Sequence, residues 1–392
     1  MAYYETGEHG KRIETFAKYL DANGLDFGLV YYDETNVANG WYLTAWCPQF
    51  ESGCALVSRT GKALILGGPE SEPFARQDSA VKETRNLPVF MVPDEEYPNA
   101  KIISFKELFK ELSSESAIKK VGIVGMDSMP YAIYKQLGAN FEGVELIDIT
   151  EDFLKYRVLK SDWEREQMQK AFDIAFLSYE KMAAEIAPGK YEYEVAAAGE
   201  HIARVNGASS FAFKAIVGSG LRANAVVPTA SDKMLCAGDL TMIGLAPRCK
   251  GYSGVIGHTL PVSGYYTKQQ GDAMKCMQDV FVLTRDALKP GMTGKQIDAL
   301  GRDYFIKHGY MKYLVCPFAH TIGIMEAEAP FFGPNSSDVL MPKMTVCVDV
   351  SFFGHPELCG ARIETGYEIT ETGARAFSPA MESALLAEIK IK

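Results

Sequence analysis

Short runs of apolar residues alternate with amphipathic stretches over the first 150 residues of the chain. Such alternation is typical of strands interleaved with helices. It predicts a small α/β domain in this part of the sequence. The expected strands are Phe27–Tyr32, Cys54–Ser58, Ala63–Gly67, Val121–Met126 and Val144–Ile147.

A long amphipathic helix is predicted to open the second part of the chain. Ser161 and Glu164 have the spacing of a capping box, and Pro188-Gly189 marks the end of the helical pattern. Its apolar positions are Met168, Ala171, Phe172, Ala175, Tyr179, Met182 and Ile186. We therefore expect an N-terminal domain of residues 1–155 and a C-terminal domain of residues 156–392.

The same plan recurs about a hundred residues later, as expected of an internal repeat. A helical run over 271–288 precedes Pro290-Gly291, and a second helix is expected over 293–308. In the first copy the second helix is expected over 193–205. Unless the two Pro-Gly pairs are placed by chance, this pattern indicates an α+β domain with internal pseudo-symmetry.

Composition narrows the class of partner. The chain of 392 residues is 47% hydrophobic, carries a formal net charge of −10, and has neither a basic run nor an uninterrupted apolar stretch of membrane-spanning length. These features disfavour nucleic acid and membranes as partners. The first residues lack the apolar core of a secretory signal, and the eight cysteines show no CxxC spacing. We expect a cytoplasmic protein with free thiols that acts on a small molecule.

Several short motifs occur in a fixed order through the second domain. Together they resemble the family of creatinase, aminopeptidase P, prolidase and methionine aminopeptidase. The motifs are Arg157-Val-Leu-Lys-Ser161, Val217-Gly-Ser-Gly220, Ala237-Gly-Asp239, Gly251-Tyr252, Lys289-Pro-Gly291, His320-Thr-Ile-Gly323, Glu328-Ala-Pro330, Met344-Thr345 and Arg362-Ile-Glu364. The resemblance implies an α+β pita-bread domain whose curved sheet holds the active site, preceded by a smaller creatinase-like α/β domain. It also implies a homodimer in which the mate's N-terminal domain lies near the site.

In the metallopeptidase members of this family, two aspartates, a histidine and two acidic residues hold two divalent cations. By the resemblance, the aspartate positions fall on Gly244 and Val255, whereas His320, Asp349 and Glu364 fill the other three. The loss of both aspartates predicts a protein without a metal cofactor. The alternative is one divalent cation at the three residues that survive.

Creatinase uses this fold without a metal to hydrolyse a C–N bond of a guanidino compound. The resemblance therefore favours a metal-independent hydrolase of a small nitrogen-rich compound, such as a guanidino, amidine or cyclic amide substrate, as in creatinase and ectoine hydrolase. Creatine itself is disfavoured, because residues that creatinase uses fall on Ser52, Val227 and Gly257. The alternatives are a metal-dependent Xaa-Pro dipeptidase or aminopeptidase with an altered metal site, and a non-catalytic small-molecule binder.

The resemblance also assigns roles to single residues. His320 is expected to transfer protons, with Asp349 and Glu364 positioning water or a cationic substrate. His258 is a fourth catalytic candidate, although strand alternation turns it away from the site and favours a core or interface role. Whether a cysteine acts as nucleophile stays open. The expected substrate-binding residues, for each of which packing is the alternative, are Phe50, Glu51, Arg222, Tyr252, Glu328 and Arg362.

Overall fold

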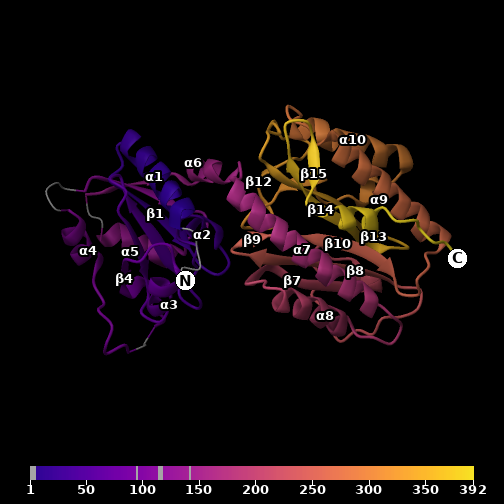
Figure 1. The fold of residues 1–392 in the computed structure, drawn as a ribbon, viewed down its shortest axis with the longest axis horizontal. Helices are drawn as coiled ribbons and strands as arrows, with labels where there is room; N and C mark the ends of the chain where they lie inside the picture. Colours follow the sequence, from indigo (N-terminus) through magenta and orange to yellow (C-terminus); the bar gives the residue numbers. More distant parts are fainter. Residues whose placement is uncertain (1–5, 94–95, 114–117, 141–142) are drawn as a thin grey trace. The chain divides into compact units, whose positions relative to one another are not determined.

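The computed structural model describes residues 6–93, 96–113, 118–140 and 143–392. It divides into two compact units, Met1–Arg157 and Val158–Lys392 (Figure 1). Within the described ranges, no helix combines the length and the apolar character that crossing a membrane requires.

The first unit is a mixed six-stranded sheet in the order β4-β3-β2-β1-β5-β6. Five strands lie where the apolar runs predict them, which confirms the α/β assignment of this unit. The sixth strand, β4, was missed, because its three residues carry polar side chains and show no apolar run. The strands are β1 (Phe27–Tyr32), β2 (Gly53–Ser58), β3 (Ala63–Gly67), β4 (Thr84–Asn86), β5 (Lys120–Val124) and β6 (Glu145–Asp148).

Helices accompany this sheet and cover its apolar side chains. Phe16 of the first helix is 1% exposed and Leu108 of the fourth is fully buried. Ser104 and Glu107 form a capping box at the start of α4. The helices are α1 (Thr6–Ala22), α2 (Ala38–Thr44), α3 (Glu72–Asp78), α4 (Phe105–Leu112), α5 (Tyr131–Asn140) and α6 (Thr150–Leu154).

The second unit is built on a nine-stranded sheet whose main path runs β12-β11-β13-β14-β10-β8-β7. The neighbouring strands along this path are antiparallel. The sheet and its helices have the pita-bread architecture that the motifs imply. Its strands are β7 (Ser210–Ser219), β8 (Leu240–Cys249), β9 (Tyr252–Ser253), β10 (Ile256–Pro261), β11 (Ala319–Thr321), β12 (Glu328–Phe331), β13 (Thr345–His355), β14 (Cys359–Ile369) and β15 (Ala374–Ala376).

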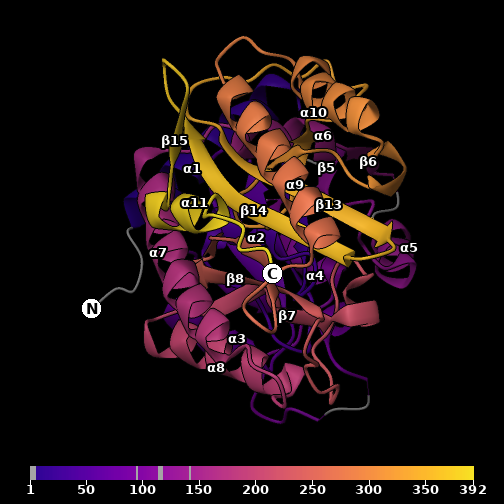
Figure 2. The same ribbon diagram turned by 90° about the vertical axis from the view of Figure 1, so that its right-hand side faces the viewer.

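The predicted repeat is visible in the helices of this unit. Two helix pairs, α7 with α8 and α9 with α10, each precede a set of sheet strands (Figure 2). Gly189 and Gly291 break the two pairs at equivalent places, with φ of +89° and +90°, a conformation that glycine adopts at no steric cost. The helices are α7 (Asp162–Glu185), α8 (Glu192–Val205), α9 (Lys268–Ala287), α10 (Gly294–His308) and α11 (Pro379–Leu385).

Helix α7 is held by the features that predicted it. Ser161 and Glu164 form the capping box. Six of the seven apolar positions named above are buried, and the seventh, Ile186, is the partly buried C-cap residue. The strand-to-strand turn before β10 comes so close to this helix that a Cβ on Gly254 would lie 2.4 Å from the backbone of Ala171 and Phe172. The helix therefore rests directly on the backbone of the turn.

Candidate functional site

The strand register places four of the residues singled out by sequence in one row across the sheet. Asp349 of β13 pairs with Glu364 of β14, Glu364 with Gly257 of β10, and Gly257 with Gly244 of β8. On the next strand, β11, His320 pairs with a residue of β13, Cys347. Because side chains alternate along a strand, Cys347 and Asp349 share one face of the sheet. Three strands thus bring together side chains that are distant in the sequence.

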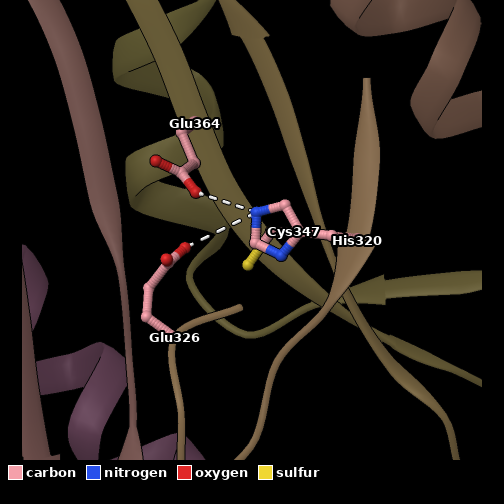
Figure 3. A group of neighbouring side chains, drawn as sticks. All are labelled: His320, Glu326, Cys347 and Glu364. Atoms are coloured by element: carbon pink, nitrogen blue, oxygen red, sulfur yellow. Dashed lines mark ion pairs between the residues drawn. The ribbon is translucent and has the colours of Figure 1, made fainter. Parts of the chain in front are cut away.

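His320 stands at the centre of this group (Figure 3). Its Nδ1 lies 3.1 Å from the carbonyl oxygen of Thr321, and in the neutral imidazole this acceptor fixes the proton on Nδ1 and leaves the Nε2 lone pair free for a cation. Nε2 lies 3.5 Å from Oε1 of Glu326 and 3.6 Å from Oε1 of Glu364. An imidazole lone pair and two carboxylate oxygens therefore converge, and all three are electron-pair donors.

The electrostatics of the group show an excess of negative charge. Burial alone would lower the pKa of His320, but Glu326 and Glu364 outweigh burial and raise this pKa to about 9. Burial, reinforced by Glu326, raises the pKa of Glu364. Burial also raises the pKa of Asp349, against the opposing effect of Arg362. Each shift favours the protonated form, so the site as a whole attracts positive charge.

A divalent cation fits this cluster. Ligand atoms of His320, Glu326, Cys347 and Glu364 all lie within 4.8 Å of one another. Two ligands bound at about 2.1 Å and at a tetrahedral angle are separated by roughly 3.4 Å, close to the distances around Nε2. Among the described residues, buried Oε1 of Glu364 makes no hydrogen bond and faces Nε2 of His320 at 3.6 Å. A buried carboxylate oxygen without a donor is costly unless a cation satisfies it.

Asp349 is engaged differently from the other acidic residues. Its Oδ1 accepts hydrogen bonds from the Ser351 hydroxyl at 2.6 Å and from Nε of Arg362 at 3.2 Å. It does not belong to the four-residue cluster. The alternative prediction of one cation at His320, Asp349 and Glu364 therefore needs a correction at Asp349. This carboxylate is already paired with the guanidinium of Arg362.

Two members of the cluster were missed by sequence reasoning. Glu326 lies in the bend between β11 and β12, where no strand period tells the direction of a side chain. Cys347 stands two residues before Asp349 on β13, and this spacing was an available signal that both point the same way. Of these two residues, only Glu326 required a structure to be recognised as a member of the cluster.

His258 lies on the other face of the sheet, so its catalytic assignment is corrected. Its Nδ1 is 2.9 Å from the hydroxyl of Tyr179 on α7, and the two rings stack at 5.6 Å. Both residues line a cavity of about 410 Å³ together with Tyr266 and Gln278. The strand alternation noted from sequence is the physical reason, because Gly257 faces the candidate site and His258 must face away from it.

The burial of His258 makes stability depend on pH. Burial lowers its pKa from 6.5 to about 4. Between these values the unfolded chain binds the proton more strongly, so stability falls as the pH falls. Wild type is expected to lose about 2 kcal/mol through this group between pH 7.5 and 5. In urea unfolding at both pH values, His258→Asn should lose correspondingly less than wild type; equal losses would contradict the prediction. Burial also lowers the pKa of His9 to about 4. Because His9 is present in both proteins, its contribution cancels when their losses are compared.

Several predicted substrate-binding residues are occupied by structural contacts. Glu51 accepts hydrogen bonds from the backbone of Glu70 and Ser71, while Phe50 is 84% exposed within the first unit. The Tyr252 hydroxyl donates to a residue of α7, Glu164, at 2.7 Å. These contacts hold the folded chain together.

Of the three remaining residues predicted to bind substrate, two make structural contacts and one lies beside the cluster. Arg222 donates to the buried carboxylate of Glu192 at 3.0 Å, and Glu328 is buried and forms an ion pair with Lys160 at 3.6 Å. Of the six predicted substrate-binding residues, Arg362 is the one that borders the cluster, through its 3.8 Å approach to Glu364.

The cysteines near the site are thiols. Burial raises the pKa of Cys316 to about 12 and the pKa of Cys347 well above its usual value. In the first unit, burial has the same effect on Cys54. Without a cation, none of these side chains has the thiolate character that a nucleophile requires.

Comparisons with known families assign both units. Residues 166–371 match Metallopeptidase family M24, and residues 12–159 match the Creatinase/Prolidase N-terminal domain. The chain belongs to the M24 metallopeptidase family, in the two-domain form shared by creatinase, aminopeptidase P and prolidase. The resemblance seen in the sequence motifs is thereby confirmed.

Individual relatives agree with this assignment. An uncharacterized peptidase, YqhT of Bacillus subtilis, is 34% identical over 261 residues, which cover 67% of this chain and 73% of that protein. The Xaa-Pro dipeptidase of Pyrococcus horikoshii is 27% identical over 365 residues, covering 93% and 96%. The solved prolidase from Pyrococcus furiosus superposes with a TM-score of 0.76 at 26% identity, covering 92% of this chain and 98% of that chain.

These findings correct the expectation of a metal-independent, creatinase-like hydrolase. The matching family is one of metallopeptidases, and two relatives that span nearly the whole chain are an Xaa-Pro dipeptidase and a prolidase. The expectation of no metal cofactor is wrong for the same reason, and because four ligand-type side chains converge. It relied on the missing carboxylates at Gly244 and Val255 and overlooked the one supplied by Glu326.

Proposed function

We propose that this protein is a metal-dependent dipeptidase that hydrolyses Xaa-Pro dipeptides, using a divalent cation held by His320, Glu326 and Glu364 with Cys347 beside them. The observation that carries the proposal is the approach of buried Glu364 Oε1, which makes no hydrogen bond within the described residues, to Nε2 of His320 at 3.6 Å. The printed activities of the full-length relatives supply the substrate class. A cation bound there would polarise the peptide carbonyl and would lower the pKa of water.

The residues of the chain have separate tasks in this hydrolysis. Water adds to the carbonyl carbon, the C–N bond to proline breaks, and a proton taken from the water passes to the leaving nitrogen. Glu326 faces the cluster through Oε1, and its other oxygen suits this proton transfer, because the Glu326 side chain is 19% exposed whereas that of Glu364 is 2% exposed. The Thr321 carbonyl keeps His320 in the tautomer that presents Nε2.

The proposal extends to location and assembly. All eight cysteines are unpaired, which suits a reducing cytoplasm. A homodimer stays a prediction from the family resemblance, and light scattering of the purified protein measures it directly.

The proposed activity is tested with a panel of dipeptides. After loading with Mn²⁺, Co²⁺ or Zn²⁺, the protein is expected to cleave Xaa-Pro dipeptides and to lose this activity in a chelator. At a Mn²⁺ concentration that saturates the variant, Glu326→Gln should still lower kcat by about 100-fold or more, as for removal of a general base. The matched control is Glu166→Gln, a carboxylate on α7 that is 61% exposed and should leave the rate unchanged. Binding of cations without cleavage of any Xaa-Pro dipeptide would refute the proposal.

A further inference from the structure

The cavity that His258 lines lies on the face of the sheet opposite the candidate site and measures about 410 Å³. Its wall is formed by α7, β10, α9, α11 and the segment that follows α11, all of which belong to the second unit (Figure 2). Leu260 and Met274 contribute to its apolar part. A cavity of this size and mixed lining is typical of a small-molecule site.

His258 presents a hydrogen-bond donor to this cavity. Its Nδ1 lies 2.9 Å from the hydroxyl of Tyr179, which makes no other hydrogen bond within the described residues. The hydroxyl must donate to Nδ1, because otherwise its own proton would have no acceptor. The neutral imidazole then carries its proton on Nε2. In the described part of the chain Nε2 makes no hydrogen bond and is not sealed from solvent, although His258 is only 5% exposed.

Gln278 of α9 presents a hydrogen-bond acceptor to the same cavity. Its Nε2 donates to the carbonyl oxygens of Leu385 at 2.9 Å and Ala387 at 3.0 Å, which fixes the orientation of the amide. Its Oε1 makes no hydrogen bond within the described ranges, and Gln278 is 8% exposed. A donor and an acceptor without partners therefore line one cavity, both on side chains that are more than nine-tenths buried. Leaving such groups unsatisfied is costly.

The interior of the cavity is uncharged. Burial lowers the pKa of His258 to about 4, so the imidazole is neutral at pH 7. Burial raises the pKa of Tyr179 to about 12, so the phenol keeps its proton. The charged residues of the lining, Glu388 and Lys390, are exposed and therefore lie at the rim. A charged ligand would lose its hydration inside without gaining a counter-charge.

We propose that this cavity binds a small uncharged molecule in which an amide group is joined to an apolar ring. The amide oxygen accepts the Nε2 proton of His258, and the amide N–H donates to Oε1 of Gln278. An amide matches both residues because it carries an acceptor and a donor close together. The ring lies against the apolar wall. Neither residue takes part in the proposed hydrolysis, so this is a second site on the reverse of the sheet.

The test uses benzamide as the probe and the folded, full-length protein. Calorimetric titration should show one benzamide bound per chain with a Kd of about 1 mM or lower, as expected for a ligand of about ten non-hydrogen atoms. Benzoate and benzylamine carry the same ring with a charge and should bind at least about tenfold more weakly. Binding of either charged compound as tightly as benzamide, or no binding of benzamide, would overturn the proposal.

Two variants locate the bound probe. His258→Phe keeps an aromatic ring, removes the Nε2 donor and should weaken benzamide binding by about tenfold, the upper range for one hydrogen bond. Ala387→Phe places a ring at an exposed lining residue and should block the cavity. The control is His201→Phe, at an exposed position of α8, which should bind as wild type does. Unchanged affinity in folded His258→Phe or in Ala387→Phe would contradict the proposal. If His258→Phe does not fold, Ala387→Phe decides.

The proton on His258 gives a readout that does not depend on affinity. In protein with ¹⁵N-labelled histidine, the signals missing from Ala387→Phe are none, whereas those missing from His258→Phe identify this imidazole. Nuclear magnetic resonance should place its proton on Nε2, and the Nε2 signal should shift when benzamide is added. A proton on Nδ1, or an Nε2 signal that benzamide leaves in place, would refute the assigned contact.

The second site and the proposed peptidase activity are independent. Cleavage of Xaa-Pro dipeptides by a protein that ignores benzamide would remove the second site and leave the activity standing. Benzamide binding without peptide cleavage would do the reverse.

Discussion

Replacing His320 with alanine is expected to weaken binding of Mn²⁺ by more than about 100-fold, because residues that merely orient a ligand are already worth 10- to 100-fold. The variant loses the Nε2 lone pair at the centre of the cluster and leaves Glu326 and Glu364 facing each other. Xaa-Pro dipeptidase activity at fixed Mn²⁺ should fall by at least the same factor. Calorimetric titration of Mn²⁺ measures the affinity, and initial rates measure the activity.

An exposed histidine provides the control for this variant. His201 lies on α8 and is exposed, so His201→Ala should match wild type in both measurements. Full affinity in His320→Ala would show that the cation binds elsewhere. Lost activity with retained affinity would assign His320 a role in proton transfer instead of cation binding.

Gly254→Ala is expected to destabilise the C-terminal unit by about 3 kcal/mol or more, the upper part of the range for overpacked interiors. The added Cβ would lie 2.4 Å from backbone atoms of Ala171 and Phe172, and backbone cannot move aside as a flexible side chain does. For a unit of this size, the melting temperature should fall by roughly 6 to 12 °C. Calorimetry and urea unfolding measure the two quantities.

A second glycine separates this clash from the general effect of adding a methyl group. Gly138 lies in α5, and a Cβ there would have no neighbour within 4 Å. Gly138→Ala should stabilise slightly, because alanine is the better helix former. Equal stability of Gly254→Ala and wild type would mean that α7 and the turn can separate without loss, contrary to the packing described.

The four long helices of the second unit and five of the six strands of the first unit could be predicted from sequence because local signals mark them. Ser161 and Glu164 define the start of α7, and Gly309, at φ +79°, ends α10 as expected of a C-cap. The three polar residues of β4 carry no such signal. That strand exists because the register of the sheet extends to it, which is a property of the folded unit.

The candidate site was predictable only in part. His320 and Glu364 were found because they stand in ordered motifs. The sequence did not predict that Glu326 joins the cluster while Asp349 pairs with Arg362. This difference depends on which carboxylate the guanidinium of Arg362 reaches. That outcome is decided by cross-strand register and by the space above Gly257, neither of which one sequence reveals.

The two repeats of the second unit meet where β10 lies beside β14, and this seam has a single register pair, Gly257 with Glu364. A side chain reinforces it, since the hydroxyl of Thr259 both donates to the carbonyl and accepts from the amide of Arg362. The buried charged groups of β14 therefore lie at the joint between the two repeats. Any slippage of one half against the other would shift the guanidinium and the acidic groups together, which couples the integrity of the repeat to the chemistry it supports.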